Sequence, residues 1–154
     1  MYSILFNEYG EIWRESPTPV NELFAFGTIA DYEANRQLIG PLDDDQLLKL
    51  RQLTLMSAAK QGLLTFGQVA ELLDLNSSNL VETLAVLARS PLLELEIDEL
   101  GQTVRFIKAS SRDIWVSGDP SPSFTKPITI ELLQKELNYG SDASTHKLKR
   151  RLES

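Results

Sequence analysis

The side chains that could carry catalysis or hold a metal are few in this chain. His146 is the only histidine, so neither a histidine-based triad nor a pair of histidine ligands can be built. There is no cysteine, which excludes disulfides, thiolate ligands and a cysteine nucleophile. Acidic clusters at residues 43–45 and 94–99 lack the neighbouring apolar pocket that raises a carboxyl pKa for acid–base chemistry. We therefore expect no enzyme, no metal site and no cofactor.

Charge and composition limit the kinds of partner that the chain can bind. The formal net charge is −7, whereas nucleic-acid binding begins with basic side chains that neutralise phosphates. The one basic run, residues 147–151, suits a helix end, where cations favour the helix dipole. No apolar run is long enough to cross a bilayer, and the first residues lack the basic and apolar regions of a signal peptide. We expect neither nucleic acid nor membrane as a partner, and a location in nucleus and cytoplasm.

We predict that residues 41–116 form the domain that positions any functional surface. A helix from Asp45 to about Lys60 begins at aspartates, which cap free N–H groups, and ends before Gly62. A brief strand over residues 63–66, two helices ending near Leu73 and Arg89, and two alternating strands follow. Helix, strand, helix, helix, strand, turn, strand is the order of a winged helix. We predict a mainly α-helical fold with a small sheet, of the α+β class.

Three further segments flank this domain. We predict that residues 1–40 form an N-terminal helical arm, with a first helix over residues 4–13. Residues 117–127, rich in proline, serine and glycine, predict a flexible linker, and residues 128–154 predict a helical tail. One side of the helix from Asp45 is polar and includes Lys49 and Thr54, yet it also carries the apolar pair Leu50 and Leu53, which indicates contact from both sides. We expect the arm to pack there, and the residues of this contact are Phe24, Phe26, Tyr32, Leu50 and Leu53.

A winged helix that reads DNA would place its third helix in the major groove. The residues of this helix predicted to face the core are Leu80, Val81, Leu84, Ala85, Leu87 and Ala88. The residues predicted to face outward carry one acid and one base, and they are Asn79, Glu82, Thr83, Val86, Arg89 and Ser90. In the predicted wing, acidic residues outnumber Arg105 and Lys108. Such a surface gains nothing from phosphates, so direct reading of DNA is the more distant alternative.

Three stretches, residues 23–35 (LFAFGTIADYEAN), 49–59 (KLRQLTLMSAA) and 111–114 (SRDI), occur in the same order as motifs that they resemble in the COP9 signalosome subunit seven family. Residues 23–35, LFAFGTIADYEAN, are similar to a stretch that precedes the winged helix in that family. Residues 49–59, KLRQLTLMSAA, resemble its KLKxLTxxSLA helix, and residues 111–114, SRDI, resemble its GRDI exit from the wing. The family's Gly-Lys-Leu-Asp wing turn keeps only its aspartate here, as Asp98. Few residues precede the first stretch, as in the shortened version found in some yeasts.

The resemblance implies a PCI-type winged helix in a non-catalytic scaffold subunit of the COP9 signalosome. Another subunit of that complex, a metal-dependent isopeptidase, performs cullin deneddylation. The implied partners are other PCI subunits, with a subunit-four-like neighbour first among them, and a shared bundle of C-terminal helices in a hetero-oligomer. Open strand edges and an apolar tail stripe suit such contacts. The predicted interface residues are Leu93, Leu95, Ile97, Val104, Phe106, Ile130, Leu133, Leu137, Leu148 and Leu152.

Two alternatives stay open at this point. The nearer is a PCI subunit of the proteasome lid or of a translation initiation complex, and the more distant is a winged-helix regulator that binds DNA. The tail has two alternatives as well. Its stripe of Ile130, Leu133 and Leu137 cannot be buried by one helix alone, so the tail either folds back or joins other helices. The resemblance favours the bundle.

Overall fold

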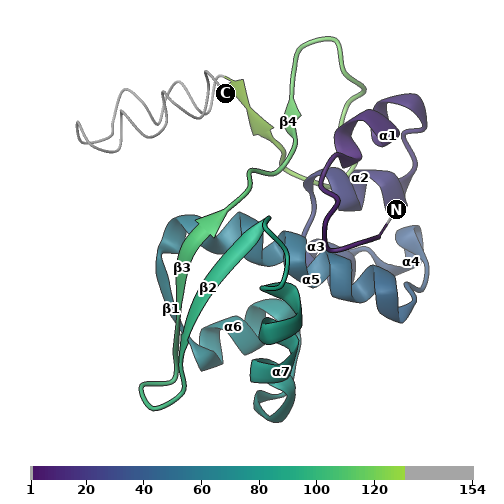
Figure 1. Ribbon diagram of the computed structural model, residues 1–154. Helices are drawn as coiled ribbons and strands as arrows, with labels where there is room; N and C mark the ends of the chain where they lie inside the picture. Colours follow the sequence, from purple (N-terminus) through teal and green to yellow (C-terminus); the bar gives the residue numbers. More distant parts are fainter. Residues whose placement is uncertain (1, 131–154) are drawn as a thin grey trace.

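The computed structural model describes residues 2–130 and has the expected α+β fold, with short helices around a small antiparallel sheet (Figure 1). The arm, residues 2–39, contains four helices: α1 (Tyr9–Glu15), α2 (Pro19–Phe26), α3 (Ile29–Ala34) and α4 (Arg36–Ile39). Helix α1 and the expectation for residues 4–13 differ. The carbonyls of Ile4 and Phe6 accept hydrogen bonds from side chains of α5 (Asp44–Ala58), so they are not part of a helical hydrogen-bond ladder.

Local capping explains where the arm helices begin. Pro19 opens α2, where its missing N–H costs nothing, and Thr18 Oγ1 accepts from the Asn21 backbone at 3.2 Å. Thr28 and Asp31 form a capping box at the start of α3, with the Thr28 N–H donating to Asp31 Oδ2 at 3.0 Å. The arm is therefore a set of short, individually capped helices whose stability depends on packing.

Helix α5 (Asp44–Ala58) lies between the arm and the rest of the molecule (Figure 1). A capping box starts it, in which the Gln46 N–H donates to Asp43 Oδ1 at 2.8 Å and the Asp43 N–H to Gln46 Oε1 at 3.0 Å. Its side chains contact both neighbours, because Gln52 donates to the arm and Arg51 Nε donates to the Leu73 carbonyl at 3.0 Å. The sequence expectation of a helix contacted from two sides is confirmed.

The sheet half, residues 59–109, follows α5 in the expected order. It contains the 3₁₀ turn Ala59–Gln61, β1 (Leu63–Thr65), α6 (Phe66–Leu73), α7 (Ser77–Leu87), β2 (Leu93–Asp98) and β3 (Thr103–Ala109). The three strands are antiparallel in the order β1-β3-β2, with Leu64 opposite Val104 and Ile97 opposite Val104 on the other side. The core between helices and sheet is apolar and includes Leu64, Val69, Leu73, Leu80, Leu84, Leu87, Leu93 and Val104.

Two positions on α7 and after it differ from the sequence expectation. Ala85 was expected to face the core but is exposed, and Ser90 was expected outward but is buried. Ser90 follows the end of the helix, so helical periodicity no longer applies to it. Its hydroxyl accepts a hydrogen bond from the Leu92 backbone at 3.1 Å and thereby shapes the turn into β2.

Residues 110–130 return to the arm. Strands β4 (Ile114–Trp115) and β5 (Ile128–Thr129) pair in parallel, with Ile114 opposite Ile128. The loop between them runs beside α1 (Figure 1), where Asp119 Oδ1 accepts from Arg14 Nε at 2.9 Å. The segment expected as a flexible linker therefore has defined contacts, which proline and serine content alone does not reveal.

Candidate functional site

Two of the predicted interface residues face the chain's own core. Leu93 and Val104 have no exposed surface, because that face of β2 and β3 packs against the helices of the sheet half. Their side chains contact α6 and α7 residues of the same core, so as direct partner contacts they were predicted wrongly. An alternating strand pattern identifies a buried face, but it does not tell whether the face is covered by the chain itself or by a partner.

The other predicted interface residues fall into two groups. Leu95, Ile97 and Phe106 are half-buried and pack against the same core. Ile130 is 41% exposed. Leu133, Leu137, Leu148 and Leu152 lie outside the described residues, so the prediction for the tail stays a prediction.

The five residues predicted for the contact of arm and α5 are all buried. Their exposed fractions are 8% or less, and the residues are Phe24, Phe26, Tyr32, Leu50 and Leu53. Aromatic pairs add to this packing, since the Tyr9 ring lies 5.6 Å from Phe24 and the Trp13 ring meets Phe26 edge-on at 4.9 Å. What the periodicity missed is that polar side chains are buried in the same contact.

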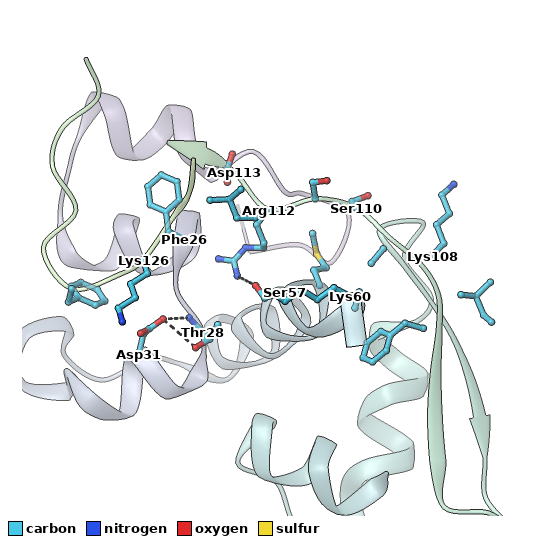
Figure 2. Close-up of a pocket in the computed structure, with 18 residues that line it drawn as sticks. Phe26, Thr28, Asp31, Ser57, Lys60, Lys108, Ser110, Arg112, Asp113 and Lys126 are labelled. Atoms are coloured by element: carbon cyan, nitrogen blue, oxygen red, sulfur yellow. Dashed lines mark hydrogen bonds between the residues drawn. The ribbon is translucent and has the colours of Figure 1, made fainter. Parts of the chain in front are cut away.

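Arg112 is the centre of that polar contact. It is 6% exposed; its Nη1 donates to the Leu53 carbonyl at 3.2 Å and to Ser57 Oγ at 2.9 Å, and its Nη2 donates to the Phe24 carbonyl at 3.2 Å. Figure 2 shows the guanidinium reaching from the segment after β3 to Ser57. Burial lowers the pKa of Arg112 to about 10, although Asp113 and Asp31 oppose this shift. The guanidinium thus joins α2 to α5.

Asp113 holds a second part of the arm. Its carboxylate accepts from the backbone N–H groups of Gly10 and Tyr9, at the start of α1. Burial raises the pKa of Asp113, and the bonds to Gly10 and the cations Arg112 and Arg14 act in the opposite direction. A Cβ on Gly10 would lie 2.9 Å from Asp113 Oδ1, so this close approach requires glycine.

Glu22 fixes the loop between β4 and β5. It is 2% exposed, and its two carboxylate oxygens accept from the backbone N–H groups of Ser123, Phe124 and Thr125 at 2.7, 3.0 and 3.0 Å. The Thr125 hydroxyl donates to the same carboxylate at 3.0 Å. A buried carboxylate with several charge-assisted bonds is well compensated for its lost hydration. The loop is therefore attached to α2 through one side chain.

Lys49 is a buried charged residue of this region, as Arg112 and Glu22 are. The ammonium donates to the Phe6 carbonyl and to Gln52 Oε1, and lies 5.7 Å from the centre of the Tyr9 ring. Burial lowers the pKa of Lys49 to about 8, and Arg112 adds to this shift. Burial also raises the pKa of Tyr9. In the sequence, Lys49 lies between Leu48 and Leu50, which could have indicated a buried lysine. The sequence analysis instead placed Lys49 on the polar side of the helix.

A groove of about 840 Å³ lies between the arm, the end of α5, β3 and the residues after β3 (Figure 2). Arg112 forms part of its wall. Apolar side chains, among them Phe26, Met56, Phe106 and Phe124, line it together with polar and charged ones. This size suits a small ligand or a short peptide segment.

No protein-family model matches the chain, and no curated protein matches it. Among residues 2–130, no group of three or more histidine, cysteine or acidic residues could hold a metal ion. Within the same part of the chain, no helix has the length and apolar character needed to cross a membrane.

The charged residues whose internal contacts sequence reasoning missed are Arg112, Asp113, Glu22 and Lys49. Three of them were quoted in stretches that resemble a known family, yet no contact was assigned to them. Their shared signal is a charged residue inside an otherwise apolar or motif-like stretch. The structure brings these stretches, far apart in sequence, to one place.

Proposed function

We propose that the chain is a non-catalytic scaffold subunit of the COP9 signalosome, which supports cullin deneddylation by another subunit. The observation that supports this most is the meeting of the three stretches that resemble the subunit seven family. Arg112 of the third stretch donates hydrogen bonds to Phe24 of the first and to Leu53 and Ser57 of the second. Residues that carry a resemblance and also form one hydrogen-bonded unit are better support than three separate matches.

The arrangement of α5, β1, α6, α7, β2 and β3 supports a PCI-type winged helix as the core of this subunit. Two helices pack on a three-stranded antiparallel sheet in the order β1-β3-β2, and the turn between β2 and β3 forms the wing. Strands β1 and β2 each have one neighbour within the described residues. The free edges offer backbone N–H and C=O groups to strands of neighbouring subunits.

The burial of Leu93 and Val104 changes how these edges would be used. Because the apolar face of the sheet is covered by the chain's own helices, contacts at β2 rely on backbone groups and on half-buried Leu95 and Ile97. Leu63 on β1 is 48% exposed and Leu100 in the wing turn is 100% exposed. We expect these two leucines to provide apolar contacts to partner strands at the β1 edge and near the β2 edge.

DNA reading is the weaker alternative. The wing carries Glu94, Glu96, Asp98 and Glu99, all exposed, against exposed Arg105 and Lys108. Arg105 is already 4.0 Å from Glu96. Phosphates approaching this surface meet more carboxylates than cations, so binding is opposed by charge.

Isolation of the full chain from its native cells tests this proposal. The chain carries a tag at its N-terminus, the salt concentration is moderate, and mass spectrometry identifies the proteins that co-purify. We expect other PCI subunits together with a metal-dependent isopeptidase. Proteasome lid or translation initiation subunits would assign the chain to another PCI assembly, and recovery of DNA-bound factors or of no partner would overturn the scaffold proposal.

The tail provides a second test of assembly. We expect Leu133→Asp with Leu137→Asp to release the chain from its partners while the purified variant still unfolds cooperatively, because a charged pair cannot enter an apolar helical bundle. Gln134→Asp with Asn138→Asp adds the same charge at polar positions and serves as the control, with co-purification retained. Loss of cooperative unfolding in the leucine variant would contradict the bundle and indicate that the tail folds back.

A further inference from the structure

The groove beside Arg112 is basic although the chain as a whole is acidic. Four cationic and two acidic side chains line it, while the formal net charge of the chain is −7. In Figure 2, Lys126 lies at one end of the groove, Lys108 at the other, and Lys60 between them. All three lysines are exposed. Positive charge is therefore spread along the groove rather than gathered at one point.

These lysines are not neutralised by the carboxylates beside them. The ion pairs found among residues 2–130 join Arg14 to Asp119, Arg36 to Glu33 and Arg105 to Glu96, and none includes a lysine of the groove. The two groove carboxylates have internal roles. Asp31 Oδ2 accepts from the Thr28 N–H and hydroxyl, and Asp113 accepts from the backbone at the start of α1.

Arg112 in the wall of the groove has one unsatisfied donor. Its Nε is buried and has no hydrogen-bond partner within the described residues, whereas Nη1 makes two hydrogen bonds and Nη2 makes one. Because this atom has no accessible surface, it makes no contact with an occupant of the groove, and the charge that an occupant meets comes from the lysines.

Backbone geometry favours an extended occupant. Strand β1 ends at Leu63 opposite Arg105, whereas β3 continues to Ala109 and keeps β2 on its other side. Among the described strands, none pairs with residues 107–109 on the side that β1 leaves free. Ile107, Lys108 and Ala109 all line the groove, and Ile107 is 49% exposed. A short open strand edge inside a groove suits a peptide, which can add backbone hydrogen bonds there.

We propose that this groove binds an extended acidic segment of a partner protein, with its carboxylates on the lysines and alternate apolar side chains on Ile107, Phe106 and Phe124. Charge complementarity selects an acidic partner, and the apolar lining selects a peptide over a nucleic acid. The inference does not depend on which assembly the chain joins, since the groove lies apart from the outer edges of β1 and β2.

Binding of a synthetic peptide to the full chain tests the inference. The probe is a short fluorescein-labelled peptide in which aspartate alternates with leucine, and fluorescence anisotropy measures its Kd. A peptide with asparagine in place of aspartate is the matched probe. We expect the acidic peptide to bind, the asparagine peptide to bind at least about tenfold more weakly, and affinity to fall as salt rises.

Two charge-reversed variants locate the site. Lys60→Glu with Lys126→Glu alters the groove, and Arg89→Glu with Arg105→Glu makes the same change in net charge at exposed positions outside it. We expect the groove variant to weaken acidic-peptide binding at least about tenfold and the control variant to change it less than about twofold. Circular dichroism checks that both variants keep the fold.

Three results would overturn the inference: no binding of the acidic peptide, equal weakening by both variants, or tighter binding of an oligonucleotide of equal charge at the same lysines. Each is distinguishable from failure of the scaffold proposal. Co-purification of PCI subunits uses the unaltered chain and does not change with the outcome of peptide binding.

Discussion

Two regions of the molecule bury different kinds of side chain: the contact between the arm and α5, and the core of the sheet half. Between the helices and sheet of residues 59–109, the buried side chains are leucines and valines, with Ser90 as the buried polar residue of that half. Around α5 and the arm, buried aromatic residues are mixed with polar and charged ones, namely Glu22, Lys49, Gln52, Thr54, Arg112 and Thr125. One half is held by apolar packing and the other by packing together with hydrogen bonds.

This difference indicates which region tolerates fewer substitutions. Apolar cores accept many combinations of side chains of similar volume, whereas a buried polar network requires each partner in place. The stretches that resemble the subunit seven family lie mainly in the polar region, and its hydrogen bonds join residues up to 103 positions apart in sequence. Variants of the two regions should therefore respond differently to conservative substitutions.

The largest contrast is expected from placing methionine in each region. Arg112→Met should lower the free energy of unfolding by about 3 kcal/mol, because the carbonyls of Phe24 and Leu53 stay buried without their donor. Leu84→Met, in the apolar core, should cost less than about 1.5 kcal/mol. Urea denaturation measures both, and equal costs would remove the distinction between the regions.

A smaller effect is expected from Glu22→Gln, which keeps the shape of the side chain but removes its charge. The amide has one acceptor oxygen for four donors from residues 123–125, so we expect a loss of about 2 kcal/mol. Hydrogen exchange at the Ser123, Phe124 and Thr125 amides should accelerate. Glu15→Gln, at an exposed position of the same arm, is the control. Unchanged exchange of these three amides would mean that the loop is held by other contacts.

The smallest effect is a pH dependence that belongs to the polar region alone. The pKa of Lys49 is lowered from 10.5 to about 8, so above pH 8 the unfolded chain binds more protons than the folded one and stability rises with pH. The raised pKa of Tyr9 acts in the opposite direction above its ordinary value of 10, which leaves a window from about pH 8 to 9.5.

Urea denaturation at pH 7.5 and pH 9.5 measures this dependence. We expect the free energy of unfolding to rise by about 1 kcal/mol in the wild-type chain and much less in Lys49→Met, since the buried ammonium is absent. A rise of the same size in both would assign the effect to another group.

The sequence predicted the sheet half well and the polar region poorly, for physical reasons. Periods of 2 and 3.6 residues report which side chains avoid water, and these identified the order of elements and most of the apolar core. Lys49, Gln52 and Thr54 are polar by type, and periodicity placed Lys49 and Thr54 on the polar side of the helix without indicating that they are buried. They are buried because Phe6, Ile4 and Ile29 provide partners from distant segments. Only three-dimensional proximity reveals such pairs.

The interface residues show a related limit. Alternation in β2 and β3 located an apolar face correctly, but Leu93 and Val104 are covered by α6 and α7 rather than left for a partner. The segment before β5 was assigned as a linker from its prolines and serines, and a single glutamate in α2 holds it. Composition does not contain information about such a contact.

Native-state hydrogen exchange on the wild-type chain and Arg112→Met tests most directly whether a polar network centred on Arg112 holds the arm on α5. We predict that the variant loses protection at arm amides, including Ile29, whose N–H donates to buried Thr54 at 3.0 Å, while amides of β3 keep theirs. Equal loss of protection in the arm and in β3, or no loss in the arm, would contradict this account.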